Sequence, residues 1–431
     1  MGWNSWDAYG TTITEAQFRA DALWMSRYLA PYGWRYAVID MEWFVRNPTP
    51  MGSGSTRGAQ LVLDRYGRYV PAPNRFPSAA GGAGLKPLAD YVHSLGLKLG
   101  IHILRGIPRE AVARNLPIEG SPYTAAQAAD VSSLCSWDPD NYGVDPRRPA
   151  GQAYYDSIAH LYASWGIDFV KADCIANSPY AGAEIRMLST ALRGSGREMV
   201  LSLSPGPAPL AKLAEMRRYA NMWRISDDTW DLWRHNRDGY QGVADHFALA
   251  AHWAPLAEDG RWPDDDMLAL GELGPAPGMG RPRHSRLTHA EQRTYVTLWC
   301  IARSPLFMGG NLTQTDPWTL SLLDNPEVIA VDQYASDSHQ ALSAGGTIAW
   351  LSIPRGAQPS SRGDRYLAVF NLQPRARTIT LSWSALSLTG SRYALRDLWQ
   401  RRDIGPAAAL RVRLDPHGAA LYRLHVTAGG P

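Results

Sequence analysis

The sequence predicts an α/β protein, in which a (β/α)8 TIM barrel is followed by a C-terminal antiparallel β-sandwich. Three observations support this prediction. The chain has 431 residues, which suits a large barrel with an appended domain. Apolar strand-like runs alternate with helical patterns as far as Asp332, and short alternating strands follow. We therefore expect residues 1–332 to form the barrel and residues 333–431 to form the sandwich.

The barrel prediction rests on strand-like runs that are separated by helical patterns. This alternation is typical of parallel βα units, and eight such units fit a closed barrel better than an open sheet. The expected strands are Met1–Trp6, Gly33–Asp40, Leu97–Ile103, Ile167–Asp173, Glu198–Ser204, Met222–Asp227, Met267–Leu270 and Arg303–Met308. The expected helices include Glu15–Leu29, Leu85–Ser94, Gly151–Trp165, Ala181–Leu192 and Ala290–Ala302.

The C-terminal part shows short runs of alternating apolar and polar residues, separated by turn residues, which is typical of an antiparallel sandwich. A polar segment rich in Gly, Ser and Pro, Arg355–Asp364, is expected to be an exposed hairpin loop, and Ala428–Pro431 is expected to fray. The expected strands are Thr347–Ile353, Tyr366–Leu372, Thr378–Ser382, Leu395–Asp397, Leu410–Leu414 and Ala419–Leu424.

Composition excludes several classes of partner. The net charge is +3, from 43 basic and 40 acidic residues, and the charges are interspersed rather than gathered into the basic stripe that nucleic acids require. No apolar run approaches the ~20 residues that cross a bilayer, so we expect no membrane span. The 17 Trp and 20 Tyr far exceed the 7 Phe, and aromatic rings with polar edges suit the faces of sugars.

The chain has three cysteines, which fit either a reduced protein or a secreted one with a single disulfide. No signal peptide opens the sequence, which begins abruptly on an apolar, Trp-rich segment. We expect a secreted or periplasmic protein whose leader is absent from this sequence, with a cytoplasmic location as the alternative. Cys300 lies in an apolar helical pattern and is expected to be core.

The ends of the expected strands carry most of the chemistry. In a barrel, catalytic groups lie where strands end and βα loops begin. Carboxylates, a lysine, an arginine and tryptophans gather there, although a single strand-end Asp is often only the N-cap of the next helix. The strand-end segments are Trp3–Trp6, Asp40–Trp43, His102, Lys171–Cys174, Ser202–Ser204, Trp223–Asp228 and Asp264–Met267.

Two carboxylic acids on one rim are the requirement for glycoside cleavage. One attacks the sugar or activates water, and the other protonates the departing oxygen. Because the rim carries more than two Asp, spacing alone does not select the pair.

Several short motifs in a fixed order resemble glycoside hydrolase family 27, the α-galactosidase and α-N-acetylgalactosaminidase family. The resemblance covers nearly the whole chain, from Met1 to the C-terminal sandwich. The motifs are Met1–Trp6, Ile39–Asp40 with Trp43, Gly96–Ile101, Trp165–Lys171, Trp223–Arg224, Asp266–Leu268 and Ser304–Leu306.

The resemblance implies a retaining mechanism. The family's nucleophile lies two residues after a strand-end lysine, which implies Asp173 after Lys171. Its acid/base lies four residues after the arginine of a Trp–Arg pair, which implies Asp228 rather than the adjacent Asp227. In retaining enzymes the two carboxyl groups lie ~5–5.5 Å apart. Lys171 lowers the pKa of Asp173 if the two charges are close.

The resemblance also implies a sugar site. Trp6 would form an aromatic wall, and Asp40 and Lys171 would bind hydroxyls. Arg224 would lie beside the 2-position and Asp266 near the nucleophile. Asp231 matches a further family acid.

A Cys135–Cys174 disulfide is implied as well, because the family joins the cysteine after the nucleophile to one in the loop after the third strand. The alternative is two free thiols.

The sequence departs from the family at the second and third strand ends. Family members carry paired acids that grip the 4- and 6-hydroxyls of galactose, but Met41 stands at the second position and Glu42 follows it. The usual Tyr is replaced by His102, which we interpret as a hydrogen-bonding wall residue. Arg105 and Arg109 follow; they either pair with rim acids such as Asp138 and Asp140 or form a fork for a substrate carboxylate.

At the fifth strand end, Ser204 stands where galactosidases have a Glu that contacts the 2-hydroxyl. Small residues there are what N-acetylgalactosaminidases use, although the following Pro205–Pro207 stretch matches neither type. With Trp43 and His102, Ser204 completes the expected substrate-binding set. β-L-arabinopyranose or an isomaltose unit is a further alternative for the sugar.

We therefore predict an exo-acting retaining glycosidase on α-galactoside-like ends of an oligosaccharide or glycoside. A carbohydrate-binding protein without turnover and a transglycosylase are the competing hypotheses. Metallohydrolase, serine-hydrolase and dinucleotide-binding signatures are missing from the sequence, so we expect no metal and no cofactor.

Overall fold

The computed structural model describes residues 1–49, 58–177, 179–237, 239–274, 281–357 and 363–426. The chain folds into two compact units, and each is made of more than one segment of sequence. The first comprises Met1–Arg224, Ala269–His284 and Phe307–Thr315, and the second comprises Ile225–Leu268, Ser285–Leu306 and Asp316–Pro431. The predicted boundary at residue 332 is not tested by this division and stays a prediction.

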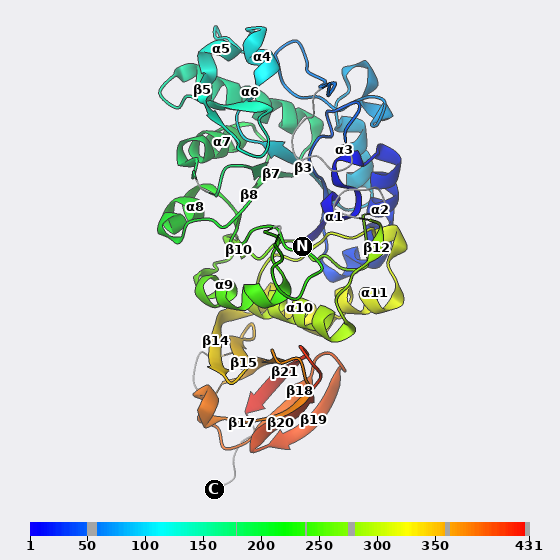
Figure 1. Cartoon of the computed structure of the whole chain (residues 1–431), viewed down its shortest axis with the longest axis vertical. Helices are drawn as coiled ribbons and strands as arrows, with labels where there is room; N and C mark the ends of the chain where they lie inside the picture. Colours follow the sequence, from blue (N-terminus) through cyan, green and yellow to red (C-terminus); the bar gives the residue numbers. More distant parts are fainter. Residues whose placement is uncertain (50–57, 178, 238, 275–280, 358–362, 427–431) are drawn as a thin grey trace. The chain divides into compact units, whose positions relative to one another are not determined.

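A parallel sheet forms the centre of the first unit, and its strands follow one another in the order β9-β8-β7-β3-β2-β1-β13. Figure 1 labels the neighbouring strands β8, β7 and β3 of this sheet. Most of its residues are buried, as expected where helices cover the faces of a parallel sheet. The strands are β1 (Gly2–Asn4), β2 (Tyr36–Ile39), β3 (Lys98–Leu104), β7 (Phe169–Asp173), β8 (Val200–Leu203), β9 (Met222–Arg224) and β13 (Phe307–Met308).

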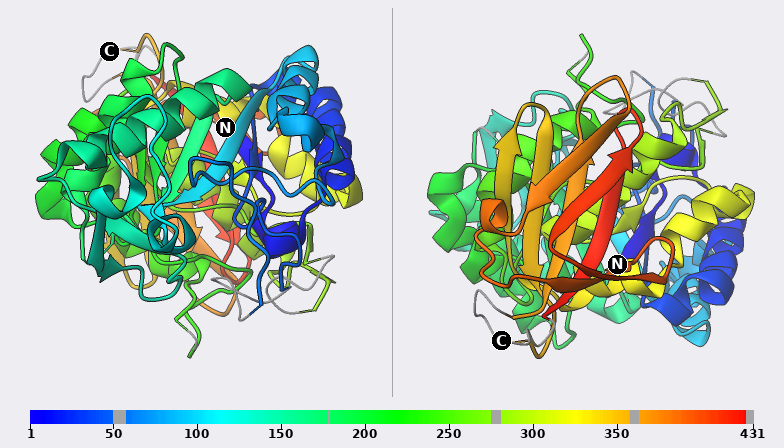
Figure 2. Two further views of the ribbon diagram at one scale, coloured as in Figure 1. Left: turned by 90° about the horizontal axis from the view of Figure 1, so that it is seen from above. Right: turned by 90° about the horizontal axis from the view of Figure 1, so that it is seen from below.

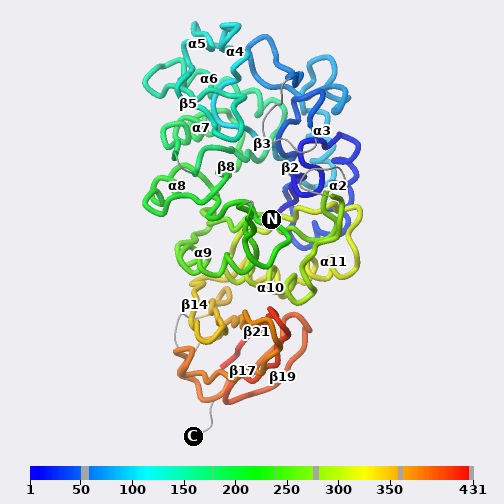
Figure 3. Tube along the Cα trace, in the orientation of Figure 1, coloured from blue at the N-terminus to red at the C-terminus, as the bar shows by residue number. Residues whose placement is uncertain are grey.

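Helices alternate with these strands along the chain (Figure 3). Helix α2 begins at a capping box formed by Thr14 and Gln17, and α6 ends at Gly166, whose φ of 82° suits a glycine. The helices of this unit are α1 (Trp6–Tyr9), α2 (Glu15–Tyr28), α3 (Lys86–Ser94), α4 (Arg109–Ala113), α5 (Ala125–Ala128), α6 (Pro149–Trp165), α7 (Gly182–Gly194) and α8 (Leu213–Tyr219).

Two small sheets were not predicted. One has the order β4-β6-β5 and belongs to the long loop after β3, which carries Cys135; the other pairs β11 with β12. Their strands are β4 (Ile107–Pro108), β5 (Ala129–Leu134), β6 (Asn141–Val144), β11 (Glu272–Leu273) and β12 (Arg283–His284).

The predicted strand Met267–Leu270 is wrong. The strand of this region is β10 (Trp262–Asp264), and Met267–Leu270 is buried irregular chain. A short buried apolar run does not distinguish a strand from a buried loop by its pattern alone. The helices of the second unit are α9 (His246–Trp253), α10 (His289–Ala302), α11 (Pro317–Leu323) and α12 (Pro326–Tyr334).

The C-terminal segment forms two antiparallel sheets, one of order β14-β15-β16-β21-β18-β19 and one pairing β17 with β20 (Figure 2). Leu351, Leu367, Leu381 and Leu410 from the two sheets share one hydrophobic core. The strands are β14 (Ser336–Ala344), β15 (Thr347–Ile353), β16 (Arg365–Asn371), β17 (Arg377–Ser382), β18 (Tyr393–Asp397), β19 (Arg402–Ala407), β20 (Ala409–Leu414) and β21 (Ala419–Val426).

The parallel βα units and the C-terminal sheets confirm the predicted fold class. Strands β14 and β19 were missed, because their residues are mostly polar or exposed and lack a clear alternation. Part of the expected loop Arg355–Asp364, and the expected frayed end Ala428–Pro431, lie outside the described residues. Cys300 is fully buried in α10, as predicted.

Candidate active site

Strand register brings four of the predicted residues to one edge of the sheet. Strand β2 ends immediately before Asp40. In the β3–β7 ladder His102 lies opposite Lys171, and Leu104 lies opposite Asp173. Because these strands are parallel and adjacent, Asp40, His102, Lys171 and Asp173 all lie at their carboxyl ends.

Asp40 is held by three donors. Lys171 Nζ and Asn4 Nδ2 donate to Asp40 Oδ2 at 2.8 and 2.7 Å, and the Met41 backbone N–H donates to Oδ1 at 2.9 Å. Burial raises the pKa of Asp40, but the charges of Lys171 and His102 outweigh it and lower this pKa to about 2. Asp40 is therefore an ionised, fixed acceptor at neutral pH.

Asp173 is also held at both oxygens. His102 Nε2 lies 3.0 Å from Oδ2, and the Cys174 backbone N–H donates to Oδ1 at 2.9 Å. Burial raises the pKa of Asp173, but the hydrogen bond and charge of His102 and the charge of Lys171 lower it below its usual value. Asp173 is thus ionised at neutral pH, with its Oδ2 at hydrogen-bond distance from the His102 ring.

Lys171 is the cation between these two carboxylates. Its side chain is 13% exposed, and burial by itself lowers the pKa of a lysine. The charges of Asp40 and Asp173 outweigh burial and raise the pKa of Lys171 above its usual value. Lys171 therefore stays charged in the site.

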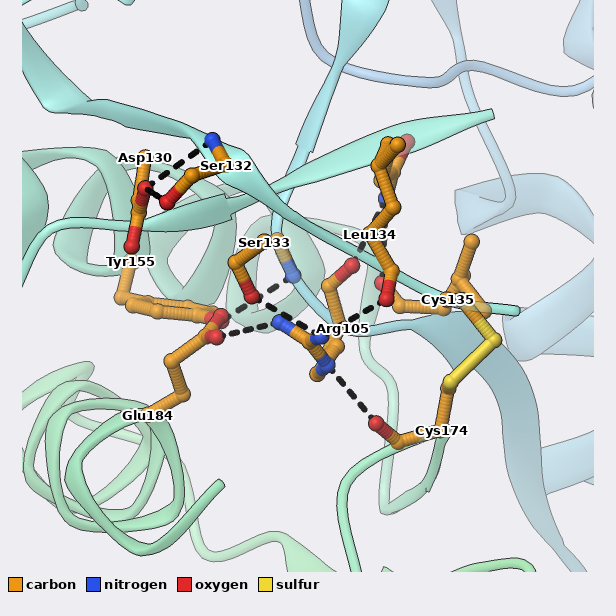
Figure 4. A network of polar contacts seen from close by, with 12 residues as sticks. Arg105, Asp130, Ser132, Ser133, Leu134, Cys135, Tyr155, Cys174 and Glu184 are labelled. Carbon is orange, nitrogen blue, oxygen red and sulfur yellow. Dashed lines mark hydrogen bonds and ion pairs between the residues drawn. A yellow bond between two sulfur atoms is a disulfide. The ribbon is translucent and has the colours of Figure 1, made fainter. Parts of the chain in front are cut away.

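The disulfide Cys135–Cys174 is present, as predicted, and joins the long loop after β3 to the residue after Asp173 (Figure 4). Cys174 has a φ of 57°, which is uncommon for a residue other than glycine. Its N–H donates to the Asp173 carboxylate, so the orientation of the peptide plane between Asp173 and Cys174 influences where that carboxylate points.

In the described part of the chain, the guanidinium groups of the two arginines after β3 form no ion pair with Asp138 or Asp140, although the Arg109 backbone N–H donates to the Asp140 carbonyl oxygen at 2.9 Å. Arg105 is buried and forms an ion pair with Glu184 of α7, with an N···O distance of 2.5 Å. Arg109 NH1 donates to the carbonyl oxygen of Pro139 at 3.3 Å, and its guanidinium lies over the Tyr142 ring.

The other predicted substrate-binding residues of this unit differ in how accessible they are. Trp43 is 1% exposed, and its indole N–H donates to the carbonyl oxygen of His102 at 2.8 Å, so Trp43 supports His102 from behind. Trp6, at the start of α1, is half-buried. Ser204 follows β8 and Arg224 ends β9, and both are buried.

An acidic cluster beside these residues was only partly anticipated. Glu42 is 2% exposed, and its Oε1 has no hydrogen-bond partner among the described residues. Burial and the charges of Asp138 and Asp140 raise the pKa of Glu42 to about 8. Burial and the charge of Asp140 raise the pKa of Asp138 to about 7, and Asp138 also interacts electrostatically with His102 and Asp173. The role of Asp138 beside the nucleophile carried no sequence signal, because it depends on how a long loop folds.

The second unit holds Asp228 and Asp266. Asp228 is half-buried, and its carbonyl oxygen accepts from Gln241 N–H at 2.9 Å. Asp266 is buried, and its Oδ2 accepts from the Thr229 N–H at 2.8 Å. Asp266 thereby fixes the residue that directly follows Asp228.

A buried hydrogen-bonded chain also anchors Thr229. Its hydroxyl lies 2.8 Å from His246 Nε2, and His246 Nδ1 lies 3.0 Å from Asp265 Oδ1. Nearby, Asp231 accepts two bonds of 2.9 Å from the Arg286 guanidinium. The negative charge of Asp231 is therefore balanced by Arg286.

None of the described helices is long and apolar enough to cross a bilayer. Within the same described part of the chain, no three or more His, Cys, Asp or Glu side chains are arranged to hold a metal ion.

Comparison with known families gives two matches. The family described as alpha galactosidase A matches residues 141–334, and the family described as alpha galactosidase C-terminal beta sandwich domain matches residues 357–424.

Solved structures and a curated relative extend the likeness to the full chain. A glycoside hydrolase family 27 β-L-arabinopyranosidase from Geobacillus stearothermophilus is 43% identical, with a TM-score of 0.92 over 100% of this chain and 97% of that chain. A candidate α-N-acetylgalactosaminidase from Bacillus halodurans is 39% identical, with a TM-score of 0.85 over 99% and 96%. An α-galactosidase of Oryza sativa is 29% identical over 437 residues, which cover 98% of this chain and 84% of the relative.

Proposed function

The chain belongs to glycoside hydrolase family 27 and is a glycosidase; on this premise we propose that it is a retaining exo-glycosidase for terminal sugars of galacto configuration, with Asp173 as nucleophile and Asp228 as general acid/base. The preferred sugar in this proposal is β-L-arabinopyranose. A β-L-arabinopyranoside has the ring configuration of an α-D-galactopyranoside but lacks the hydroxymethyl group at C5.

The environment of Asp173 is the single observation that carries the proposal. A nucleophilic carboxylate must be ionised and fixed in direction. Asp173 meets both needs, because both of its oxygens accept hydrogen bonds and its pKa is lowered. Lys171 compensates the negative charge of Asp173, and its ion pair with Asp40 keeps the ammonium group in the site.

The reaction follows in two displacements. Asp173 attacks the anomeric carbon while Asp228 gives its proton to the departing glycosidic oxygen, which leaves a sugar esterified to Asp173. Asp228 then takes a proton from water as the water oxygen attacks the anomeric carbon and frees Asp173. Two inversions give net retention. Asp266, through Thr229, positions the Asp228 loop for both steps.

The remaining side chains recognise the sugar in this proposal. Asp40 accepts from ring hydroxyls and Lys171 donates to them, because the pair presents both a fixed acceptor and a fixed cation. Trp6 offers the aromatic wall, while Arg224 and Ser204 lie toward the 2-position. Trp43 acts indirectly, by holding His102.

Met41 supports the choice of a pentose. It occupies the position of the second family acid, and a thioether does not accept the hydrogen bond of a galactose 6-hydroxyl as a carboxylate does. Glu42 follows, and its buried carboxyl is neutral at mildly acidic pH because its pKa is about 8. A neutral Glu42 donates a hydrogen bond to a sugar hydroxyl. The likeness to the Geobacillus stearothermophilus β-L-arabinopyranosidase points in the same direction.

The test is hydrolysis of a panel of nitrophenyl glycosides: β-L-arabinopyranoside, α-D-galactoside, α-N-acetylgalactosaminide and α-glucoside. We expect the highest kcat/KM on the arabinopyranoside. A higher value on another panel member would replace the sugar but keep the class. Silence across the panel by a folded protein, together with sugar binding that survives Asp173→Asn, would favour the carbohydrate-binding alternative.

Azide separates the two carboxylic acids. We expect Asp173→Ala to lower kcat by about 10³-fold or more, and azide to restore turnover with a glycosyl azide of inverted anomeric configuration. For Asp228→Ala the azide product keeps the configuration of the substrate. The same assays with an added sugar acceptor reveal transglycosylation, because the glycosyl-enzyme intermediate is shared. Full activity of either variant would contradict its assignment.

The disulfide supports an oxidising compartment, secreted or periplasmic, as part of the proposal, because structural disulfides persist mainly there.

A further inference from the structure

Arg105 is a buried residue that donates hydrogen bonds to the carbonyl oxygen of the nucleophile and to that of the next residue. It directly follows β3 and is 4% exposed. Its backbone N–H donates to the carbonyl oxygen of Asp173 at 3.1 Å, and its side-chain Nε donates to the carbonyl oxygen of Cys174 at 2.7 Å. One residue therefore fixes two consecutive peptide carbonyls at the end of β7.

The same guanidinium reaches the other end of the disulfide (Figure 4). Its NH2 donates to Ser133 Oγ at 3.1 Å and to the carbonyl oxygen of Leu134, directly before Cys135, at 3.4 Å. Arg105 thus joins, without a covalent bond, the two segments that Cys135–Cys174 joins with one.

Glu184 and Tyr155 hold the guanidinium from the helices behind the sheet. Arg105 NH1 lies 2.5 Å from Glu184 Oε1, and the Tyr155 hydroxyl donates to Glu184 Oε2 at 2.7 Å. The Gly106 N–H donates to the Tyr155 oxygen at 3.1 Å. Because both charges are paired and hydrogen-bonded, these contacts offset the desolvation cost of the buried ion pair and hold the guanidinium in one position.

The conformation that Arg105 holds bears on the reaction. Cys174 is in the left-handed region, which costs a residue with a side chain roughly 1–2 kcal/mol, so it persists only where contacts impose it. Its N–H is the donor to Asp173 Oδ1. This N–H shares a peptide plane with the Asp173 carbonyl group, so loosening the Asp173–Cys174 turn would let the plane rotate and take the donor away from the carboxylate.

We propose that Arg105 is a positioning residue for the nucleophile, and that it acts together with the disulfide to fix the Asp173–Cys174 turn. This inference rests on the proposed role of Asp173. Arg105 touches no reacting atom; it sets the direction in which the Asp173 carboxylate attacks.

The test compares Arg105→Gln and Arg105→Lys with Arg68→Gln. Arg68 is a matched control, because it is also 4% exposed in the same unit and pairs with Asp64 and Glu119. Its side-chain hydrogen bonds and ion pairs reach Asp64, Glu119 and Ser157, and among the described residues none reaches residues 133–135 or residues 173–174. Kinetics on nitrophenyl β-L-arabinopyranoside and α-galactoside are measured well below each variant's Tm.

We expect Arg105→Gln to lower kcat about 10²-fold with KM changed less than about threefold, because misplacing a reacting group costs rate rather than binding. Arg105→Lys recovers part of the rate, because one donor remains. Arg68→Gln loses a comparable amount of thermal stability but keeps kcat within about twofold. Equal kcat losses in Arg68→Gln and Arg105→Gln would overturn the proposal.

A milder variant keeps the proposal testable without removing a buried charge. Tyr155→Phe deletes one hydroxyl, which loosens Glu184 and through it Arg105. We expect a fall in kcat of roughly 3–10-fold at unchanged KM, consistent with a small displacement. An unchanged kcat in this variant together with an unchanged kcat in Arg105→Lys would contradict the positioning role of Arg105.

Removal of the disulfide by Cys135→Ser with Cys174→Ser tests whether the two restraints act on one turn. We expect the kcat loss of the combined variant, with Arg105→Gln added, to differ from the product of the separate losses, because contacting groups are not additive. Simple multiplication would overturn joint action.

The azide assay on Asp173→Ala separates this inference from the proposed function. If Asp173→Ala stays active, the assignment of Asp173 as nucleophile is wrong, and the positioning role proposed for Arg105 is wrong with it. If Asp173→Ala is inactive and rescued by azide while Arg105→Gln behaves like Arg68→Gln, the nucleophile assignment stands and only the positioning role of Arg105 is rejected.

Discussion

At the scale of single residues, the site is an arrangement of charges that compensate one another. Lys171 lies between Asp40 and Asp173, and the His102 ring lies at hydrogen-bond distance from Asp173 Oδ2. Burial alone would favour neutral carboxyl groups, yet the pKa values of Asp40 and Asp173 fall below their usual values. The nearby cation outweighs the loss of water, and this is why the acids stay ionised.

Lys171→Met removes the cation and leaves Asp40 buried and unpaired. We expect the free energy of unfolding at pH 7 to fall by about 3–5 kcal/mol. Urea unfolding measures it, and adding Asp40→Asn recovers part of the loss because no charge is left unpaired. Asp40 contributes stability above its unfolded pKa of 3.8, and this contribution is lost as pH falls through about 2. An additive double variant would contradict the pairing.

Glu42 has the opposite pH dependence. Its folded-state pKa of about 8 exceeds the unfolded value of 4.5, so its contribution is fully present below pH 4.5 and is lost as pH rises through 8. Glu42→Gln keeps the neutral form. We expect the variant to unfold at the same Tm as the parent below pH 4.5 and to gain up to about 5 kcal/mol over it at pH 9. A constant difference between pH 4 and pH 9 would show that Glu42 is not buried as a neutral acid.

Met41→Asp tests the basis of sugar preference. A carboxylate at this position restores an acceptor for a 6-hydroxyl, so we expect the ratio of kcat/KM for α-galactoside over β-L-arabinopyranoside to rise about tenfold or more. Met41→Leu is the matched control, because it keeps an apolar side chain of similar volume and leaves the ratio unchanged. A ratio that moves equally in both variants would place the preference elsewhere.

At the scale of elements, loops that follow strands are fixed by buried groups from other parts of the same unit. The turn after β7 is held by Arg105 and a disulfide. In the second unit, the Asp228 loop is held by Asp266 and by the chain from Asp265 through His246 to Thr229. Each of the two proposed catalytic acids is therefore followed immediately by an anchored residue.

Thr229→Val removes the hydroxyl from that chain while it keeps the shape of the side chain. We expect kcat to fall roughly tenfold with little change in KM, because Asp228 loses its fixed neighbour. Thr297→Val is the control: Thr297 is equally buried in the second unit, but its hydroxyl serves Arg293 O and Trp399. If the two variants lost kcat to the same extent, the effect would be general rather than local.

At the scale of the whole molecule, one covalent cross-link ties together two distant parts of the first unit. Cys135 and Cys174 are 39 residues apart in sequence. Closing a loop of this length restricts the unfolded chain by about 4 kcal/mol in the chain-entropy account. We expect Cys135→Ser with Cys174→Ser to lower the free energy of unfolding by that order. Cys300→Ala, which removes a free buried thiol, is the control, and calorimetry measures the free energy of unfolding of both variants. We expect Cys300→Ala to cost far less; equal losses would refute the role of the cross-link.

The fold class could be predicted from the sequence because alternation of strand and helix is a local pattern. The misses fall where local pattern is weak. Met267–Leu270 is apolar and buried without being a strand, and β14 and β19 are edge-like segments with little alternation. The strand-end residues Asp40, Lys171 and Asp173 were found because the topology of a parallel sheet gathers strand ends at one edge.

The sequence by itself determined the parallel βα units and the antiparallel C-terminal strands, because these follow from periodicity. The order of short motifs carried the resemblance to the family, and that resemblance implied the cysteine pair. Only the tertiary structure decided which charges meet. Lys171 pairs with Asp40, 131 residues away, and Arg105 pairs with Glu184 rather than with Asp138 or Asp140. Strand register and loop folding bring such groups together, and neither is encoded in the spacing of the groups themselves.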